Sequence, residues 1–348
     1  MGNLLAYSGL VTKVHAMQAK LLTPAQYKEL ASLHNVTEVY HYLKEQSAYS
    51  IHFQDITDAN LHRGDIEKLL IQSLYSDYSR LYSFSGVAQQ QFLKLYLKRY
   101  EVDLINYCFR IIFNHYDEPF DLNHKKAFFN KYSQISIDKL ITSRTMQELV
   151  ENLKDTEYYE PLKKLNSSNA TTLFDYDLAL DLYYYSTLWK NRKKIFKGRE
   201  LETITTDTGT KIDLLNLQWI YRAKRYYNMD EADIYSMLIP IQYHIHFSKL
   251  KELVETSSLE EFAAVVRTTS YTHKYPLEQP IALEAIYTDC LDHLYRLDRR
   301  RNPYSIATLN TYLFLKEEEL KKLTTVLECA RYGISGRETL NYLGGVIK

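Results

Sequence analysis

The chain repeats one local pattern three times, at intervals of about 110 residues. In each copy an oxygen-bearing side chain is followed three positions later by glutamate, then by an apolar residue and finally by tyrosine. The copies occupy residues 35–49, 145–158 and 258–271, and end at Tyr49, Tyr158 and Tyr271. A polar side chain with glutamate three positions on is typical of a helix N-terminus, where both satisfy free backbone amides. The pattern predicts a short capped helix and a tyrosine-bearing turn in each copy.

A second marker follows each tyrosine by about fifty residues. It occupies residues 102–106, 212–216 and, in a looser form, 318–322. Two markers that recur in the same order indicate a triplicated architecture. We expect each second marker to open a long amphipathic helix. Its carboxylate (Asp103, Asp213 or Glu319) would then lie in the first turns, where the helix dipole favours negative charge.

Apolar residues recur every three or four positions along 93–111, 212–226 and 320–330, as on the buried face of a helix. No stretch alternates with period two for long enough to require a sheet. Only 10 Gly and 7 Pro occur in 348 residues, which argues against a turn-rich β architecture. The sequence therefore predicts an all-α fold. The repeats predict three helical lobes, at residues 1–118, 119–230 and 231–348.

Charge is balanced over the whole chain, with 43 basic and 43 acidic residues. No global field is therefore directed at nucleic acid or at an anionic membrane. The strongest local cluster is Lys190–Arg199, in which six of ten residues are basic, and Arg299–Arg301 is a smaller one. Each cluster either binds a polyanion or an acidic protein, or complements a helix C-terminal dipole. We favour the dipole interpretation, with Gly198 as the helix cap and the threonine-rich stretch 202–210 as a break before the next long helix.

Candidates for chemistry are few. His244 and His246 are two positions apart, so on a helix they would face different directions and would not form a ligand pair. Glycine-rich phosphate loops are absent. No combination of nucleophile, base and orienting group is evident. We predict no catalytic, cofactor-binding or metal-binding residue and no cofactor, and we expect the chain not to be an enzyme.

Cysteine usage and hydropathy indicate the compartment. Cys108, Cys290 and Cys329 are far apart and fit neither a disulfide framework nor a metal motif, which suits a reducing environment. The N-terminus lacks the profile of a signal peptide. No apolar run approaches eighteen residues, so we expect a soluble protein.

Five segments together carry a resemblance to a known family. They are Tyr7–Leu22, Tyr27–Leu30, Lys98–Asn106, Ile212–Arg222 and Leu315–Gly333. In this order the chain resembles the C subunit of the bacterial and archaeal V-type (A/V-type) rotary ATPases, the family that includes the eukaryotic d subunit. The resemblance spans essentially the whole chain, although each motif is degenerate alone.

The resemblance implies a non-catalytic rotor part. Members of the family form three pseudo-threefold helical lobes in a funnel, whose cavity receives the tip of the central stalk, made of the D and F subunits. The other face sits on the membrane rotor ring, so the funnel transmits torque. The chain is then expected at the cytoplasmic face of the membrane, held there only through the complex, with no nucleic acid bound. The transported ion is a proton or sodium, with ATP either made or hydrolysed.

Two other classes of protein stay open from the residues alone. An all-α scaffold or adaptor would bind protein or nucleic acid through its basic patches, and a continuous groove joining the two basic clusters would support it. An enzyme with a dispersed site would show carboxylates and histidines gathered in one pocket.

Overall fold

The computed structural model describes residues 2–53, 61–114, 121–166, 172–273, 277 and 282–344. Within these residues the chain is helical and has no strand, so the all-α prediction is confirmed. The chain divides into two compact units, Met1–Gln90 with Asp298–Lys348, and Gln91–Leu297. We call them unit 1 and unit 2. The division into lobes at 118 and 230 stays a prediction, and residue 118 lies outside the described residues.

Long helices occur in pairs, and each pair is joined by a short turn. The pairs are α4 (Arg63–Phe84) with α5 (Val87–Phe113), α10 (Leu173–Ile195) with α11 (Gly198–Arg222), and α15 (Leu283–Arg301) with α16 (Ile306–Arg331). The first helices of the three pairs begin at Arg63, Leu173 and Leu283, which are 110 residues apart. The period read from the sequence is therefore present in the order of the helices.

A pair of short helices precedes each tyrosine of the first marker. The pairs are α2 (Pro24–Ala31) with α3 (Val36–Glu45), α7 (Ile137–Leu140) with α8 (Met146–Asn152), and α13 (Phe247–Glu255) with α14 (Leu259–Arg267). The side chains of Asn35, Thr145 and Ser258 cap the second helix of each pair, accepting from the amide three residues on. The predicted N-caps are confirmed.

The glutamate of each cap returns a hydrogen bond, but one residue earlier than in the usual capping box. The Glu38 carboxylate accepts from the amide of His34 at 2.8 Å, and the equivalent bonds in the other two copies are also 2.8 Å. One more backbone donor is thereby satisfied in each copy. The same geometry in three places supports an internal repeat.

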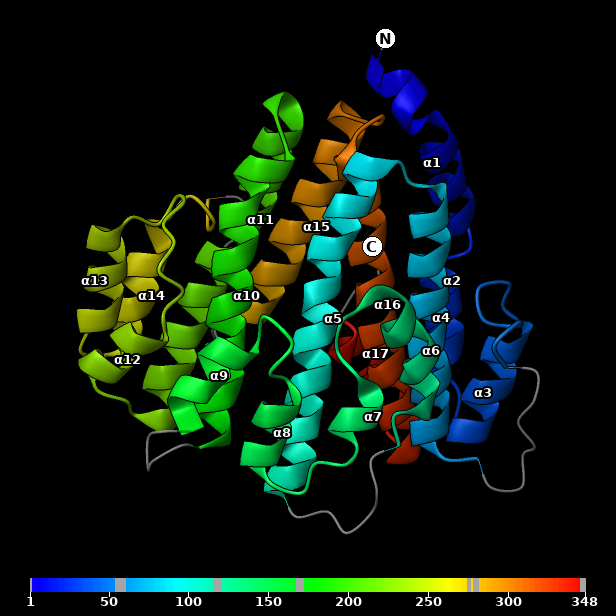
Figure 1. Cartoon of the computed structure of the whole chain (residues 1–348), viewed down its shortest axis with the longest axis horizontal. Helices are drawn as coiled ribbons and strands as arrows, with labels where there is room; N and C mark the ends of the chain where they lie inside the picture. Colours follow the sequence, from blue (N-terminus) through cyan, green and yellow to red (C-terminus); the bar gives the residue numbers. More distant parts are fainter. Residues whose placement is uncertain are drawn as a thin grey trace. The chain divides into compact units, whose positions relative to one another are not determined.

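The short helices of unit 1 share a core with the last long helix. Tyr27, Tyr40 and Leu43 pack with Leu323 and Leu327 of α16. Two further helices of this unit, α1 (Gly2–Gln18) and α17 (Gly336–Tyr342), pack on α16 as well, α1 also contacting α4 and α17 also contacting α2 (Figure 1). The helices α1 and α17, far apart in the sequence, therefore pack on the same long helix.

Unit 2 is built around α10 and α11, which pack side by side (Figure 1). Here α9 (Tyr159–Asn166) packs on α10 and on α8, and α14 packs on α11. Another helix, α12 (Glu231–Met237), packs on α13, while α6 (Asn123–Tyr132) packs on α7. A π-helical turn, Ala223–Tyr227, extends α11. No described helix is both long and apolar enough to cross a membrane.

The second markers do not open the long helices, so that prediction is wrong. The helices α5, α11 and α16 begin at Val87, Gly198 and Ile306, and the markers lie well inside them. Their carboxylates are therefore beyond the reach of the N-terminal dipole, which fades after the first turn. Another reason is needed for their positions.

Two predictions about the turn between α10 and α11 are also wrong. Gly198 has a left-handed φ of 53° but begins α11, and the amide of Phe196 closes α10 by donating to the Arg192 carbonyl. The threonine-rich stretch 202–210 is helical, with Thr203, Thr208 and Thr210 buried. Threonine lowers helix propensity by less than about 0.7 kcal/mol per residue, and burial of this face outweighs that cost.

Candidate functional site

Three buried tyrosine hydroxyls each donate to a buried carboxylate on a long helix. In the third repeat, Tyr271 lies just after α14 and donates to Asp213 Oδ2 of α11 at 2.8 Å. The amides of His244 and Ile245, just before α13, donate to the same oxygen at 2.7 and 3.0 Å. Asp213 is only 1% exposed, and these three donors replace the water that it loses on burial. We call this arrangement a tyrosine–carboxylate joint.

The joint of the first repeat also contains a buried lysine. Tyr49 donates to Glu319 Oε1 of α16 at 2.5 Å, and the amide of Leu22 donates to the other oxygen at 2.6 Å. Lys316, one turn earlier on α16, is 1% exposed and donates to the Tyr49 hydroxyl at 2.9 Å and to Glu319 at 3.3 Å. Its ammonium also lies 4.2 Å from the centre of the Tyr49 ring. Both members of this buried ion pair thus make further hydrogen bonds, Glu319 with Tyr49 and Leu22 and Lys316 with the Tyr49 hydroxyl.

The joint of the second repeat uses Glu101 of α5. Tyr158 donates to Glu101 Oε2 at 2.6 Å, and the hydroxyl of Ser133 donates to the other oxygen. Lys98, one turn before Glu101, pairs with Glu157, the neighbour of the joint tyrosine. Lys98 and Glu101 thus repeat the spacing of Lys316 and Glu319.

Each joint crosses from one repeat to another. Tyr158 belongs to the second repeat and binds the long helix of the first, and Tyr271 of the third binds the long helix of the second. Tyr49 of the first repeat binds α16, the long helix of the last. The turns after the short helices of the second and third repeats are therefore bonded to the preceding long helix, and the turn of the first repeat is bonded to α16.

Burial is the largest cause that raises the pKa of each joint tyrosine, and the carboxylate beside it raises the pKa further. The hydroxyls therefore keep their protons and remain donors at neutral pH. Burial also raises the pKa of Asp213, against the lowering effect of the hydrogen bonds from Tyr271 and the backbone amides. Hydrogen bonds to a charged group contribute about 1.5–3 kcal/mol each. The joints therefore stabilise the packing of each tyrosine-bearing turn on its long helix.

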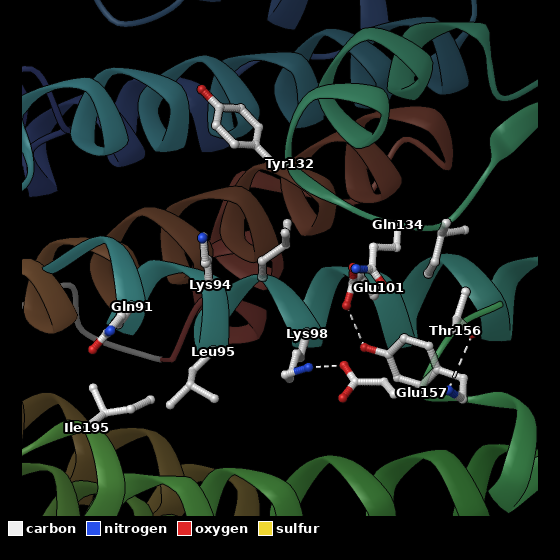
Figure 2. Close-up of a pocket in the computed structure, with 13 residues that line it drawn as sticks. Gln91, Lys94, Leu95, Lys98, Glu101, Tyr132, Gln134, Thr156, Glu157 and Ile195 are labelled. Carbon is white, nitrogen blue, oxygen red and sulfur yellow. Dashed lines mark hydrogen bonds and ion pairs between the residues drawn. The ribbon is translucent and has the colours of Figure 1, made fainter. Parts of the chain in front are cut away.

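A groove of about 580 Å³ runs along α5 beside the joint of the second repeat. Figure 2 shows Gln91 and Ile195 at one end of it, and Glu101, Thr156 and Glu157 at the other. The dashed lines mark the bonds of Lys98 to Glu157 and of Glu101 to its tyrosine (Figure 2). The two carboxylates that line the groove, Glu101 and Glu157, already bind Tyr158 and Lys98. Lys94 also lines the groove and is exposed.

The positions four residues before the joint carboxylates Asp213 and Glu101 carry different residues, Gly209 on α11 and Leu97 on α5. In the third repeat the ring of Tyr243 lies so close to Gly209 of α11 that an added Cβ would approach ring carbons at 2.4 Å. In the second repeat, Leu97 and Tyr132 both line the groove.

The carboxylates of the three second markers, which were predicted to lie in the first turns of long helices, have different roles in the structure. Asp213 and Glu319 are joint carboxylates, but Asp103 is not: it is exposed and pairs with Arg99 at 3.5 Å. Sequence reasoning missed Glu101, although the spacing Lys-x-x-Glu, shared by Lys98–Glu101 and Lys316–Glu319, was an available signal.

The other candidates take up structural positions. His244 donates its amide to Asp213, and His246 is the residue before α13. Among the described residues, no group of three or more His, Cys, Asp or Glu side chains is placed to hold a metal ion. Cys108, Cys290 and Cys329 form no disulfide in the described part of the chain, and burial raises the pKa of Cys108 to about 12.

Comparison with known proteins assigns the family. A sequence model described as ATP synthase (C/AC39) subunit matches residues 10–342. The chain is 24% identical over 341 residues to the C subunit of the A-type ATP synthase of Methanocaldococcus jannaschii, covering 94% of this chain and 83% of the relative. The C subunit of the A-type ATP synthase of Thermococcus kodakarensis is 23% identical over 348 residues, covering 98% of this chain and 91% of the relative. That of Methanosarcina mazei is 26% identical over 267 residues, covering 76% and 71%.

The match extends through all three repeats and includes every joint residue. The helices and their order agree with the all-α fold expected from the resemblance. This chain belongs to the ATP synthase (C/AC39) subunit family.

Proposed function

We propose that the chain is a non-catalytic rotor subunit of a V/A-type ATPase. It forms a socket that receives the central stalk, the D and F subunits, on one side and rests on the membrane rotor ring on the other. ATP is made or hydrolysed in the catalytic head, and ions cross at the ring. The family match supports this role, because the relatives are named as the C subunits of A-type ATP synthases.

The tyrosine–carboxylate joints, each of which connects two repeats, are the observation that carries the proposal. A part that transmits torque must resist sliding of one lobe against the next. Each joint fixes the short helices of one repeat to the long helix of another, and Tyr49 fixes the first repeat to α16 of the last. At about 1.5–3 kcal/mol for each charge-assisted hydrogen bond, the joints oppose such sliding without any metal or disulfide.

The proposal includes the placement of the chain. Three lobes at 1–118, 119–230 and 231–348 form a funnel around a common axis, and the protein lies peripherally on the cytoplasmic face of the membrane. It reaches the membrane only through the complex. The absence of a spanning helix among the described residues is compatible with this placement.

A bridging experiment tests the function. The host's rotor ring, purified in detergent, is immobilised and incubated with its purified D–F stalk, with and without this chain. We expect the stalk to be retained only when the chain is present, in a ratio of one chain to one stalk. Retention of the stalk by the ring alone, or failure of the chain to bind both, would contradict the proposal. A chain unfolded by heat and recooled, checked by circular dichroism, is the negative control.

A further inference from the structure

The turn between α10 and α11 carries an unusual concentration of charge. Five exposed cations surround it, and we call them the basic tip: Lys190, Lys193, Lys194, Lys197 and Arg199. No ion pair joins any of them to a carboxylate in the part of the chain that the structure describes. The basic tip is therefore a concentrated positive surface on a protein whose charges balance overall, with Glu200 and Glu202 as the neighbouring carboxylates on α11.

The basic tip is held in a fixed conformation from within. Arg192, the sixth basic residue of the cluster, is buried and its guanidinium lies 3.3 Å from the centre of the Trp189 ring. It also donates to the Thr205 hydroxyl of α11 at 3.0 Å and to the Trp189 carbonyl. Phe196 is buried in the turn against Phe92. The five exposed cations thus project from a braced hairpin.

The helix dipole does not account for the whole cluster. Lys193 and Lys194 lie in the last turn of α10, where a cation is favourable. Lys197 and Arg199 lie instead at the start of α11, where the dipole is positive and a cation is unfavourable by about 0.3–1 kcal/mol. Glu200 in the same first turn offsets part of this cost, and the remaining concentration of positive charge indicates a partner.

The surroundings of the basic tip favour a protein surface over nucleic acid or lipid. Binding of single-stranded nucleic acid uses exposed aromatic rings on which bases stack. Here Phe196 is buried, and Trp189 is packed between Arg192 and Tyr243. Stable membrane attachment needs an inserted apolar group besides charge, and the exposed side chains of the basic tip are all cationic. Carboxylates on a folded partner suit such a surface.

The other two long-helix turns have different chemistry. The turn between α4 and α5 exposes Phe84 and Val87, and the turn between α15 and α16 exposes Arg300 and Arg301. Among these three turns, the one between α10 and α11 exposes the most cations. A contact that depends on this charge therefore belongs to the basic tip and not to the other two turns.

We propose that the basic tip docks onto a carboxylate-rich surface of the central stalk. This inference rests on the proposed function and names the contact within it. The groove along α5 continues the surface, because Ile195, the last residue of α10, lines it with Gln91 and the exposed Lys94 (Figure 2). The charges steer the stalk and fix its rotational position on the body.

Charge reversal tests the inference in the full chain. Lys193, Lys194 and Lys197 are changed together to Glu, and a control variant carries Glu at Lys163, Lys251 and Arg267, three exposed cations of the same unit. Both variants change the net charge by the same amount. Affinity for the purified D–F stalk is measured by calorimetry across a salt series, after circular dichroism has confirmed folding. We expect the basic-tip variant to bind at least about tenfold more weakly at low salt, and the control variant to bind like the wild type.

Each outcome decides between the proposals. If the wild type fails to bind the stalk, the proposed function fails with the inference. If all three proteins bind equally, the inference is overturned while the proposed function stands. If the basic-tip variant keeps its affinity for the stalk but loses binding to a DNA oligonucleotide or to anionic phosphatidylglycerol vesicles, the inference is overturned as well, because the partner is then a different macromolecule. Carbodiimide cross-linking is an independent check, and it should join Lys193, Lys194 or Lys197 to carboxylates of the stalk.

Discussion

Replacing Tyr271 by phenylalanine tests the joints by removing a single oxygen. The ring stays, so the packing between α14 and α11 is kept. The hydroxyl that donates to Asp213 at 2.8 Å is lost. Asp213 is buried, so solvent does not reach it to replace the missing donor. The carboxylate keeps its backbone donors, which include the amides of His244 and Ile245.

The cost follows from the kind of bond that is lost. A hydrogen bond to a charged group contributes about 1.5–3 kcal/mol, and the backbone donors to Asp213 remain, so we expect about 2 kcal/mol. Unit 2 spans 91–297, a size at which 1 kcal/mol lowers Tm by about 2–4 °C. The variant should therefore melt about 4–8 °C below the wild type.

Tryptophan fluorescence is the appropriate assay. Trp189 and Trp219 are the only tryptophans of the chain, and both lie in unit 2. Their emission during urea and thermal unfolding reports on the unit that contains Tyr271. The control is Tyr227→Phe, the same chemical change at a tyrosine that is 71% exposed, and it should change the free energy of unfolding by less than about 0.5 kcal/mol. Equal stability of the two variants would refute the role given to the joints.

Three further predictions concern single positions. Gly209→Ala should destabilise by about 1–3 kcal/mol, because the new methyl group meets a tyrosine ring, whereas Gly64→Ala in α4, where nothing lies within 4 Å, should stabilise slightly; thermal unfolding distinguishes them. Lys316→Met leaves Glu319 buried without its cation and should cost about 3–5 kcal/mol in urea unfolding, and a second change of Glu319 to Gln should restore part of that loss. Because burial raises the pKa of Asp213, the folded chain keeps that proton to higher pH than the unfolded chain, so this stabilisation is present below the unfolded value of about 3.9 and is lost as pH rises through the folded pKa. Asp213→Asn should remove this pH dependence from the urea midpoints; an unchanged dependence would contradict it.

Local signals in the sequence predicted local structure well. Asn35, Thr145 and Ser258 cap helices because a side-chain oxygen at that position has a nearby backbone donor to accept from. The 110-residue period was visible because each repeat needs the same caps, the same turn and the same long helices. The all-α class followed from helical spacing of apolar residues.

The contacts between repeats were not predictable in the same way. Spacing alone does not tell which long helix a turn docks on, because Tyr49 reaches Glu319, which is 270 residues away. Glu101 was missed because Asp103 aligned better with Asp213, although it faces solvent. The starts of α5, α11 and α16 were misplaced because burial, rather than propensity, makes stretches such as 202–210 helical.

Coupling between ATP hydrolysis and ion movement is the most direct test of the account. The host complex is assembled in lipid vesicles with and without this chain, and ATP hydrolysis and ATP-driven ion uptake are measured in the same sample. We predict that without the chain the catalytic head still hydrolyses ATP while ion uptake is lost, and that adding the purified chain restores uptake. Ion uptake that stays proportional to hydrolysis in its absence would show that torque reaches the ring by another route.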